Sequence, residues 1–289
     1  MAIDRCSLVR RHNPVLRSFD PRSPLSIGNG EFAFTVDGTG LQTFRARYEE
    51  SVPLCTQAQW GWHSFPSTGK EEALQLEDYD AGGRTVRYAT RSSGQQETFA
   101  RLRRNPHRLN LGAIGFLFSH PGSPQPEPES IENPYQELDL WTGVILSRWC
   151  VSGAPVMAAT CCHPRRDAVS IRAESPLFAA AMVGVEIAFP YGSPEMSASD
   201  WSSPEQHCSE TFESGPRLLG IRRTLDATQY ACFIHLGGGA VARRNGEHSF
   251  LIHASPGKER LSIVVEFSPR ADPREALWSE EVEAESAES

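Results

Sequence analysis

The sequence lacks the features that mark export, membrane insertion and nucleic-acid binding. Its first twenty residues contain four arginines but no apolar stretch, which excludes a typical signal peptide. No apolar run is long enough to span a bilayer, and the best candidate, residues 177–188, is expected to form a buried strand or a pair of strands. Basic residues are scattered and the formal net charge is −8, so no cluster of Lys and Arg predicts phosphate-backbone binding. We therefore expect a cytoplasmic protein that binds neither membrane nor nucleic acid.

Common catalytic and cofactor motifs are also missing. The sequence contains no P-loop, no G-x-S-x-G nucleophile elbow and no H-E-x-x-H zinc helix. Its seven cysteines are an odd number, and without an export signal we expect most of them to be reduced and buried. Cys161, Cys162 and His163 suggest metal ligands, but no second C-x-x-C or H-x-x-x-H accompanies them. We therefore expect structural thiols, no metal and no cofactor.

Short strands joined by turns dominate what is present. Segments of alternating apolar and polar residues recur along the chain, separated by turn dipeptides such as Asn245-Gly246. The 21 prolines and 23 glycines suit many such turns. We expect an all-β protein with little helix, a large antiparallel two-sheet β-sandwich over residues 1–270. Residues 271–289 are expected to form an acidic C-terminal tail, either a short helix or disordered.

Several blocks carry a family resemblance. They are SIGNGEFAFTVDGTGLQTF from Ser26, PLCTQAQWGWHSFP from Pro53, NPHRLNLGAIGF from Asn105, QELDLWTG from Gln136 and RTLDATQYACF from Arg223. In this order they resemble the leading domain of six-hairpin glycosidase-like proteins, the clan of maltose and kojibiose phosphorylases. The resemblance covers about the first 268 residues and implies a supersandwich-like fold.

The same resemblance bears on activity. In that clan the catalytic acid and base carboxylates lie on a helical barrel that follows the sandwich. Here an acidic tail follows instead, so we expect neither hydrolysis nor phosphorolysis. The alternative, that the sequence is cut from a longer protein, would restore that reaction.

The block QAQWGWH is the first candidate site. Extended backbone would place Gln57, Gln59 and His63 on one side and Trp60 and Trp62 on the other. Aromatic faces with amide and imidazole groups can bind a sugar, and they can equally hold a polyene or a lactone. The alternative is that both tryptophans fill the core and the histidine caps a loop.

A long connection between two expected strands is the second candidate site. It contains Tyr191, Asp200, Trp201 and His207. An Asp and a His this close in sequence can form an oriented acid and base pair. The alternative is that the aspartate caps a turn and the histidine is exposed. A similar pair precedes another turn: Asp139 and Trp141.

These sites suit two functions. In the first, the sandwich is repurposed to bind an apolar metabolite and to catalyse a cofactor-free isomerisation or cyclisation of the Diels–Alder type in a biosynthetic pathway. Orienting a flexible substrate can lower a barrier by up to about 7–11 kcal/mol, and a donor on a carbonyl can add about 3 kcal/mol. His63, Gln59 and Tyr191 are the candidate catalytic donors, and the other site residues would bind substrate. The alternative is a carbohydrate-binding or accessory module of a glycoside hydrolase or phosphorylase, non-catalytic by itself. A homodimer is left open.

Overall fold

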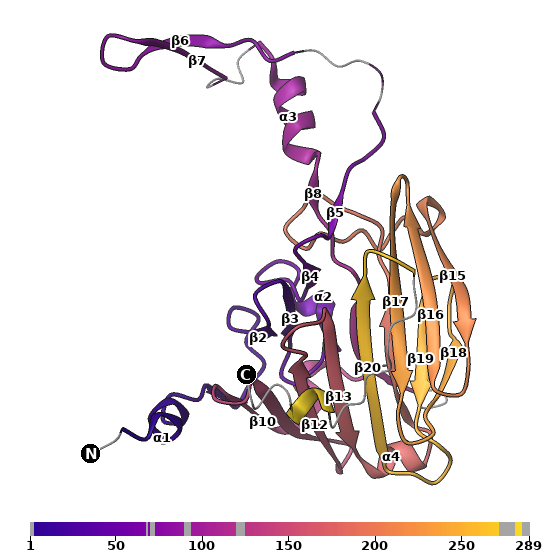
Figure 1. Cartoon of the computed structure of the whole chain (residues 1–289). Helices are drawn as coiled ribbons and strands as arrows, with labels where there is room; N and C mark the ends of the chain where they lie inside the picture. Colours follow the sequence, from indigo (N-terminus) through magenta and orange to yellow (C-terminus); the bar gives the residue numbers. More distant parts are fainter. Residues whose placement is uncertain are drawn as a thin grey trace.

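The computed structural model describes residues 3–67, 69, 73–89, 94–119, 125–271 and 281–284. Antiparallel sheets dominate its regular secondary structure, which confirms the all-β prediction (Figure 1). Among the described residues, no helix combines the length and the apolar character that crossing a membrane requires.

A nine-stranded sheet forms the larger layer. Its strands pair antiparallel throughout, mostly with chain neighbours, because short turns return the chain beside the strand it has just left. In sheet order they are β1 (Val15–Leu16), β10 (Ile131–Asp139), β11 (Val144–Val151), β12 (Ala154–Cys162), β13 (Ala168–Glu174), β20 (Arg260–Ser268), β17 (Thr228–Leu236), β16 (Leu218–Leu225) and β15 (His207–Ser214).

Two smaller sheets complete the sandwich. The four-stranded sheet consists of β18 (Val241–Arg244), β19 (Ser249–His253), β14 (Val183–Ala188) and β9 (Ala113–Phe118). The three-stranded sheet consists of β2 (Leu25–Gly28), β3 (Phe32–Val36) and β4 (Thr56–Ala58). The expected hairpin at Asn245-Gly246 is confirmed, since it joins the paired strands β18 and β19.

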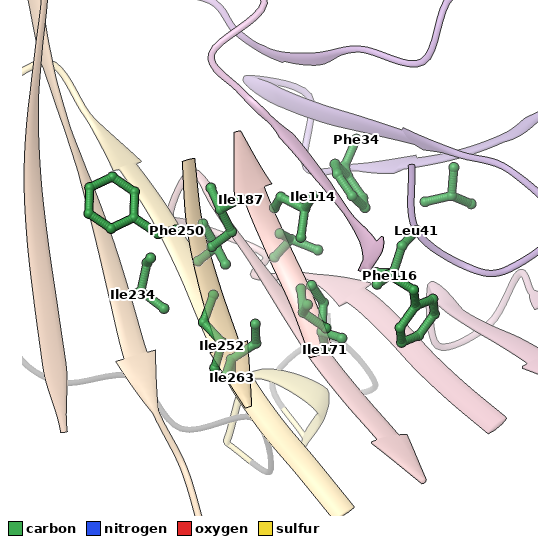
Figure 2. Close-up of a cluster of buried hydrophobic side chains, with 14 of the residues drawn as sticks. Phe34, Leu41, Ile114, Phe116, Ile171, Ile187, Ile234, Phe250, Ile252 and Ile263 are labelled. Carbon is green, nitrogen blue, oxygen red and sulfur yellow. The ribbon is translucent and has the colours of Figure 1, made fainter. Parts of the chain in front are cut away.

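The core lies between these sheets. Figure 2 shows Ile171 and Ile263 of the large sheet near Ile187 and Ile252 of the four-stranded sheet, and all four are buried. Burying each such side chain stabilises the fold by about 1.5–3 kcal/mol. Alternate residues of these strands point into this layer, which is the period-two pattern that the sequence displays.

The helices are short, as expected. They are α1 (Arg5–Arg10), α2 (Arg45–Tyr48), α3 (Gln96–Arg104) and α4 (Pro176–Ala179), with 3-10 turns η1 (Pro128–Ser130) and η2 (Pro204–Gln206). In Figure 1, α3 and the hairpin of β6 (Glu77–Asp80) and β7 (Thr85–Tyr88) extend from the sandwich beyond β5 (Trp62–His63) and β8 (His107–Arg108).

One strand expectation is wrong in its first half. The apolar run 177–188 begins as the helix α4 and becomes β14 only at Val183. Ser175 caps the helix by accepting a hydrogen bond from the Leu177 N–H, and Pro176 occupies its first turn. A capping signal therefore outweighed the apolar pattern.

Only part of the expected acidic tail is described. Residues 281–284 are helical, and Val282 is fully buried against the nine-stranded sheet. Residues 272–280 and 285–289, on which the rest of the tail prediction falls, lie outside the described residues.

Candidate functional site

The QAQWGWH block does not run as one extended strand. It leaves β4 after Ala58 and turns at Gln59 and Trp60, where the Gly61 N–H donates to the Ala58 carbonyl at 2.9 Å. After this turn His63 is buried, whereas Gln59 is exposed and Gln57 is half-buried. The prediction that these three side chains share one side is therefore wrong, because the turn breaks the alternation on which it rests.

The two tryptophans of this block occupy separate places. Trp60 is partly buried against the core, and its indole N–H donates to the Asp167 carboxylate at 2.6 Å. Trp62 is 44% exposed, lies 4.2 Å below the guanidinium of Arg108 and donates to the Gln59 carbonyl at 3.0 Å. The two indoles therefore do not form one binding surface. Trp60 packs against the core, as the alternative interpretation proposed, whereas Trp62 does not.

His63 and Tyr191 meet instead at an aspartate that the sequence reasoning missed. The Tyr191 hydroxyl donates to Asp226 Oδ2 at 2.5 Å, and His63 Nε2 lies 3.3 Å from the same oxygen. His63 Nδ1 lies 3.1 Å from the Thr228 hydroxyl. Asp226 occupies the β16–β17 turn with a φ of 49°, a conformation that aspartate tolerates well. The only sequence signal was an Asp between two strand patterns.

Burial sets the protonation of this cluster. Burial, together with the neighbouring His107 ring at 5.1 Å, lowers the pKa of His63, and Asp226 opposes this only in part. Burial and the hydrogen bond to Asp226 raise the pKa of Tyr191. A Cβ on Gly192 would lie 2.5 Å from His63 Cδ2, so this packing needs glycine after the tyrosine. The cluster thus holds a neutral imidazole and a phenol whose proton is committed to Asp226.

The long connection after β14 forms a hollow in front of Tyr191. Its volume is about 490 Å³. A second hollow of about 270 Å³ adjoins it, and Trp201 lines both. We call the two together the Trp201 hollow. Aromatic and polar side chains line its larger part: Phe65, Tyr191, Trp201, Glu49, Ser193, Asp200, Ser202 and Gln206. The smaller part adds Phe189, His207 and His248. The structure therefore brings four predicted residues into one hollow.

Trp201 is held in place by its neighbours. The Arg45 guanidinium lies 4.2 Å from the centre of its ring, a cation–π contact from the short helix α2. Burial lowers the pKa of Arg45, while the charges of Glu186 and Glu49 oppose this. The indole is half-buried and presents part of its surface to both parts of the hollow.

Asp200 and His207 do not pair with each other. Asp200 accepts hydrogen bonds from the Ser202 N–H and hydroxyl at 2.8 and 2.6 Å and from the Ser203 hydroxyl at 2.8 Å. His207 contacts the buried Arg223 through Nδ1, and its ring stacks on His248 with 3.8 Å between ring centres. Asp200 therefore caps a turn, as the alternative interpretation proposed, and the predicted acid and base pair is wrong.

The His207 environment predicts a pH dependence of stability. Burial, the Arg223 charge and His248 lower the pKa of His207 to about 3, against an ordinary 6.5, although Asp200 opposes this. Between these pH values the unfolded chain binds a proton that the folded chain does not, so the free energy of unfolding falls as pH falls. Asp37 acts in the opposite direction, because burial raises its pKa to about 6.

We expect a His207→Gln variant to lose less stability than the wild type when pH is lowered from about 7 to about 4.5. The full shift would give about 2.5 kcal/mol over this pH range, and because His207 is partly exposed, solvent screening reduces the expected difference to about 1–2 kcal/mol. Urea unfolding at both pH values measures it. Equal losses in both proteins would show that His207 titrates normally.

The remaining candidate pair lies elsewhere. Asp139 ends β10 and forms an ion pair with Arg10 of α1 at 3.0 Å. It also accepts a hydrogen bond from the Trp141 N–H at 3.0 Å, and Trp141 is 43% exposed in the turn before β11. Asp139 therefore links the first helix to β10, and neither Asp139 nor Trp141 lines the Trp201 hollow.

The thiols are dispersed. All seven cysteines are free, with Cys161, Cys162 and Cys232 buried and Cys208 exposed. Burial raises the pKa of Cys161 to about 12, so this thiol stays protonated. Within the described part of the chain, no group of three or more His, Cys, Asp or Glu side chains is arranged to hold a metal ion.

Comparison with known proteins supports the architecture. No protein-family model and no curated protein matches the chain. Among solved structures, a protein described as a kojibiose phosphorylase from the human microbiome matches with a TM-score of 0.52 and 10% sequence identity. The match covers 92% of this chain and 34% of that one, so the chain spans about a third of the length of that protein. The likeness establishes the fold alone, a β-sandwich related to a domain of that protein.

Proposed function

We propose that the chain is a carbohydrate-binding β-sandwich module, accessory to a glycoside hydrolase or phosphorylase and non-catalytic by itself. The observation that carries this proposal is the Trp201 hollow, which combines an indole surface with carboxylate, amide and hydroxyl groups. The fold likeness to a protein described as a kojibiose phosphorylase supports the same substrate class.

The chemistry of the hollow suits a sugar. A pyranose ring has an apolar face that stacks on an aromatic side chain and a rim of hydroxyls that needs donors and acceptors. Trp201 provides the aromatic surface, while Glu49 and Gln206 provide polar groups in the same lining. Arg45 fixes the indole and two serines fix the Asp200 carboxylate, so little ordering is needed on binding.

The same groups argue against catalysis in this hollow. Glycoside cleavage needs one carboxyl that donates a proton and a second about 5–10 Å away. Hydrogen bonds from Ser202 hold the pKa of Asp200 below its usual range despite the opposing effect of burial, so this carboxylate is a poor general acid. The Tyr191 hydroxyl, proposed as a catalytic donor, already donates to Asp226.

The cyclase hypothesis gains no support from this geometry. It requires an apolar cavity with a free donor, whereas the lining of the Trp201 hollow mixes aromatic side chains with carboxylate, amide and hydroxyl groups. His63 is buried behind Tyr191, and Gln59 lies on another part of the surface beside Glu31. Cyclisation therefore stays a prediction from the sequence.

We expect Trp201→Ala to weaken carbohydrate binding at least about tenfold, the equivalent of about 1.4 kcal/mol. Titration calorimetry with glucose, maltose and kojibiose measures it. Trp62→Ala is the matched control, because Trp62 is also a partly exposed indole with an arginine 4.2 Å from its ring. The control should bind as the wild type does.

A thermal-shift and mass-spectrometric screen against apolar polyenes and terpenoids separates the two functions. Sugar binding without product formation agrees with the module. Binding of an apolar metabolite, with formation of an isomer of equal mass, would overturn the proposal in favour of the cyclase. Equal loss of sugar affinity in both tryptophan variants would show that the sugar does not bind specifically in the Trp201 hollow.

A further inference from the structure

The nine-stranded sheet has a second face, turned away from the core, and a helix occupies part of it. In the described residues 281–284, Val282 is completely buried in a small apolar cluster with Cys161, Ala168 and Val264 of the sheet. The neighbouring Glu283 forms an ion pair with Arg172 at 2.8 Å. This face therefore already seats a helix through one apolar side chain and one carboxylate.

The next positions along the same strands are exposed or half-buried. Strand register aligns them in two rows that cross β11, β12, β13 and β20. The first row is Leu146, Ala159, Arg172 and Ser262, and the second row is Arg148, Met157, Glu174 and Arg260. Together they line a hollow of about 480 Å³, which we call the outer-face hollow. Arg172 lines this hollow and also pairs with the helix, so the hollow continues the helix seat.

The outer-face hollow has an apolar floor and a basic rim. Leu146 and Met157 are 42% and 47% exposed, although both lie in central strands of a sheet. Glu174 pairs with Arg260 at 2.9 Å, and Arg148 is an additional cation whose guanidinium lies 5.4 Å from the Tyr135 ring. The lining contains three arginines and one glutamate, so it carries an excess of positive charge in a protein whose net charge is −8. Arg172 and Arg260 each already pair with a carboxylate, and the Arg148 charge acts on Glu137, so an incoming carboxylate would compete with these partners.

We propose that the outer-face hollow docks an acidic amphipathic helix of a partner protein. Apolar residues one turn apart would cover Leu146 and Met157, and flanking carboxylates would face Arg148 and Arg260. The helix at residues 281–284 already makes both kinds of contact in the neighbouring row of the same face, since Val282 is buried in an apolar cluster and Glu283 pairs with Arg172. Of this chain's own residues outside the described ranges, 285–289 contain no large apolar side chain, whereas 272–280 contain Leu277 and Trp278. Failure of the wild-type chain to bind either peptide would therefore overturn the proposal.

Charge reversal tests this docking. The probes are two fluorescein-labelled 16-residue helical peptides with leucines at every third or fourth position, one flanked by glutamates and its twin by lysines. Fluorescence anisotropy should show that the wild-type chain binds the acidic peptide at least about tenfold more tightly, an affinity that falls as salt rises. The double variant Arg148→Glu with Arg260→Glu should reverse the preference.

Further variants keep the result interpretable. Arg222→Glu, on the outward-facing side of β16 away from the hollow, should leave peptide binding unchanged. Arg148→Gln with Arg260→Gln should remove the preference without introducing repulsion between carboxylates. Equal binding of both peptides, or an equal effect of Arg222→Glu, would overturn the proposal. Self-association in sedimentation that the charge-reversal variant abolishes would assign this face to a second copy instead.

Discussion

Replacing Arg166 with methionine is expected to lower the free energy of unfolding by about 3–5 kcal/mol. Its guanidinium donates to both carboxylate oxygens of Glu266, at 3.0 and 2.6 Å. Glu266 is fully buried, and the Arg166 side chain is only 18% exposed. Without the guanidinium, the buried carboxylate would lose both hydrogen bonds, while His235, at 3.6 Å, stays beside it.

A double-mutant cycle with Glu266→Gln isolates the pair. Urea unfolding at pH about 7 should show that the double variant loses clearly less stability than the two single losses added together. A loss below about 1 kcal/mol for Arg166→Met would contradict the prediction.

The same pair should depend on pH in a defined direction. Burial alone would raise the pKa of Glu266, but hydrogen bonds from His235 and Arg166 outweigh it and hold the pKa below its usual 4.5. The stabilisation is therefore present above pH 4.5 and is lost as pH falls below it. The difference between wild type and Arg166→Met should shrink in acid.

Replacing Trp149 with alanine is expected to cost about 3–5 kcal/mol, the range for truncating a large buried aromatic side chain. Trp149 is 2% exposed on the inward face of β11. Its ring packs edge-on against Phe116 of β9 at 5.5 Å between ring centres, and its N–H donates to the Thr39 carbonyl at 3.3 Å. The change would open a cavity between the sheets and leave that carbonyl without this donor.

Trp141 provides the matched control in the turn before the same strand. It is 43% exposed, so Trp141→Ala should change the free energy of unfolding by no more than about 0.5 kcal/mol. Melting curves and urea titrations of both variants measure the contrast. Similar losses in the two variants would mean that the β10–β11 turn contributes far more to stability than its exposure indicates.

The strands were predictable from sequence because burial on one face imposes a two-residue period. Val169, Ile171 and Ala173 of β13 point inward while Arg172 between them points out, and this alternation is visible in the sequence. The strand prediction for residues 177–188 was wrong in its first half because a short apolar run is compatible with both a buried helix and a buried strand.

The candidate site was only half predictable. The connection from Tyr191 to His207 stood out as a long polar segment that interrupts the strands, and it does form the Trp201 hollow. The role of Asp226 could not be derived, because the turn that carries it is far from His63 in the sequence and the two meet only in the folded protein. Residue types and short-range spacing give no information about a contact between residues so far apart in the sequence.

The sequence by itself determined the all-β class, the positions of many strands and the acidic balance of charge, because each depends on residue type and short-range spacing. Tertiary structure decided which side chains meet. A single turn at Gln59 and Trp60 separated Gln57 from His63, and sheet register aligned Leu146 with Arg172 across three strands. Strand register and turn positions depend on the whole sandwich, because the arrangement that packs the complete core has the lowest free energy.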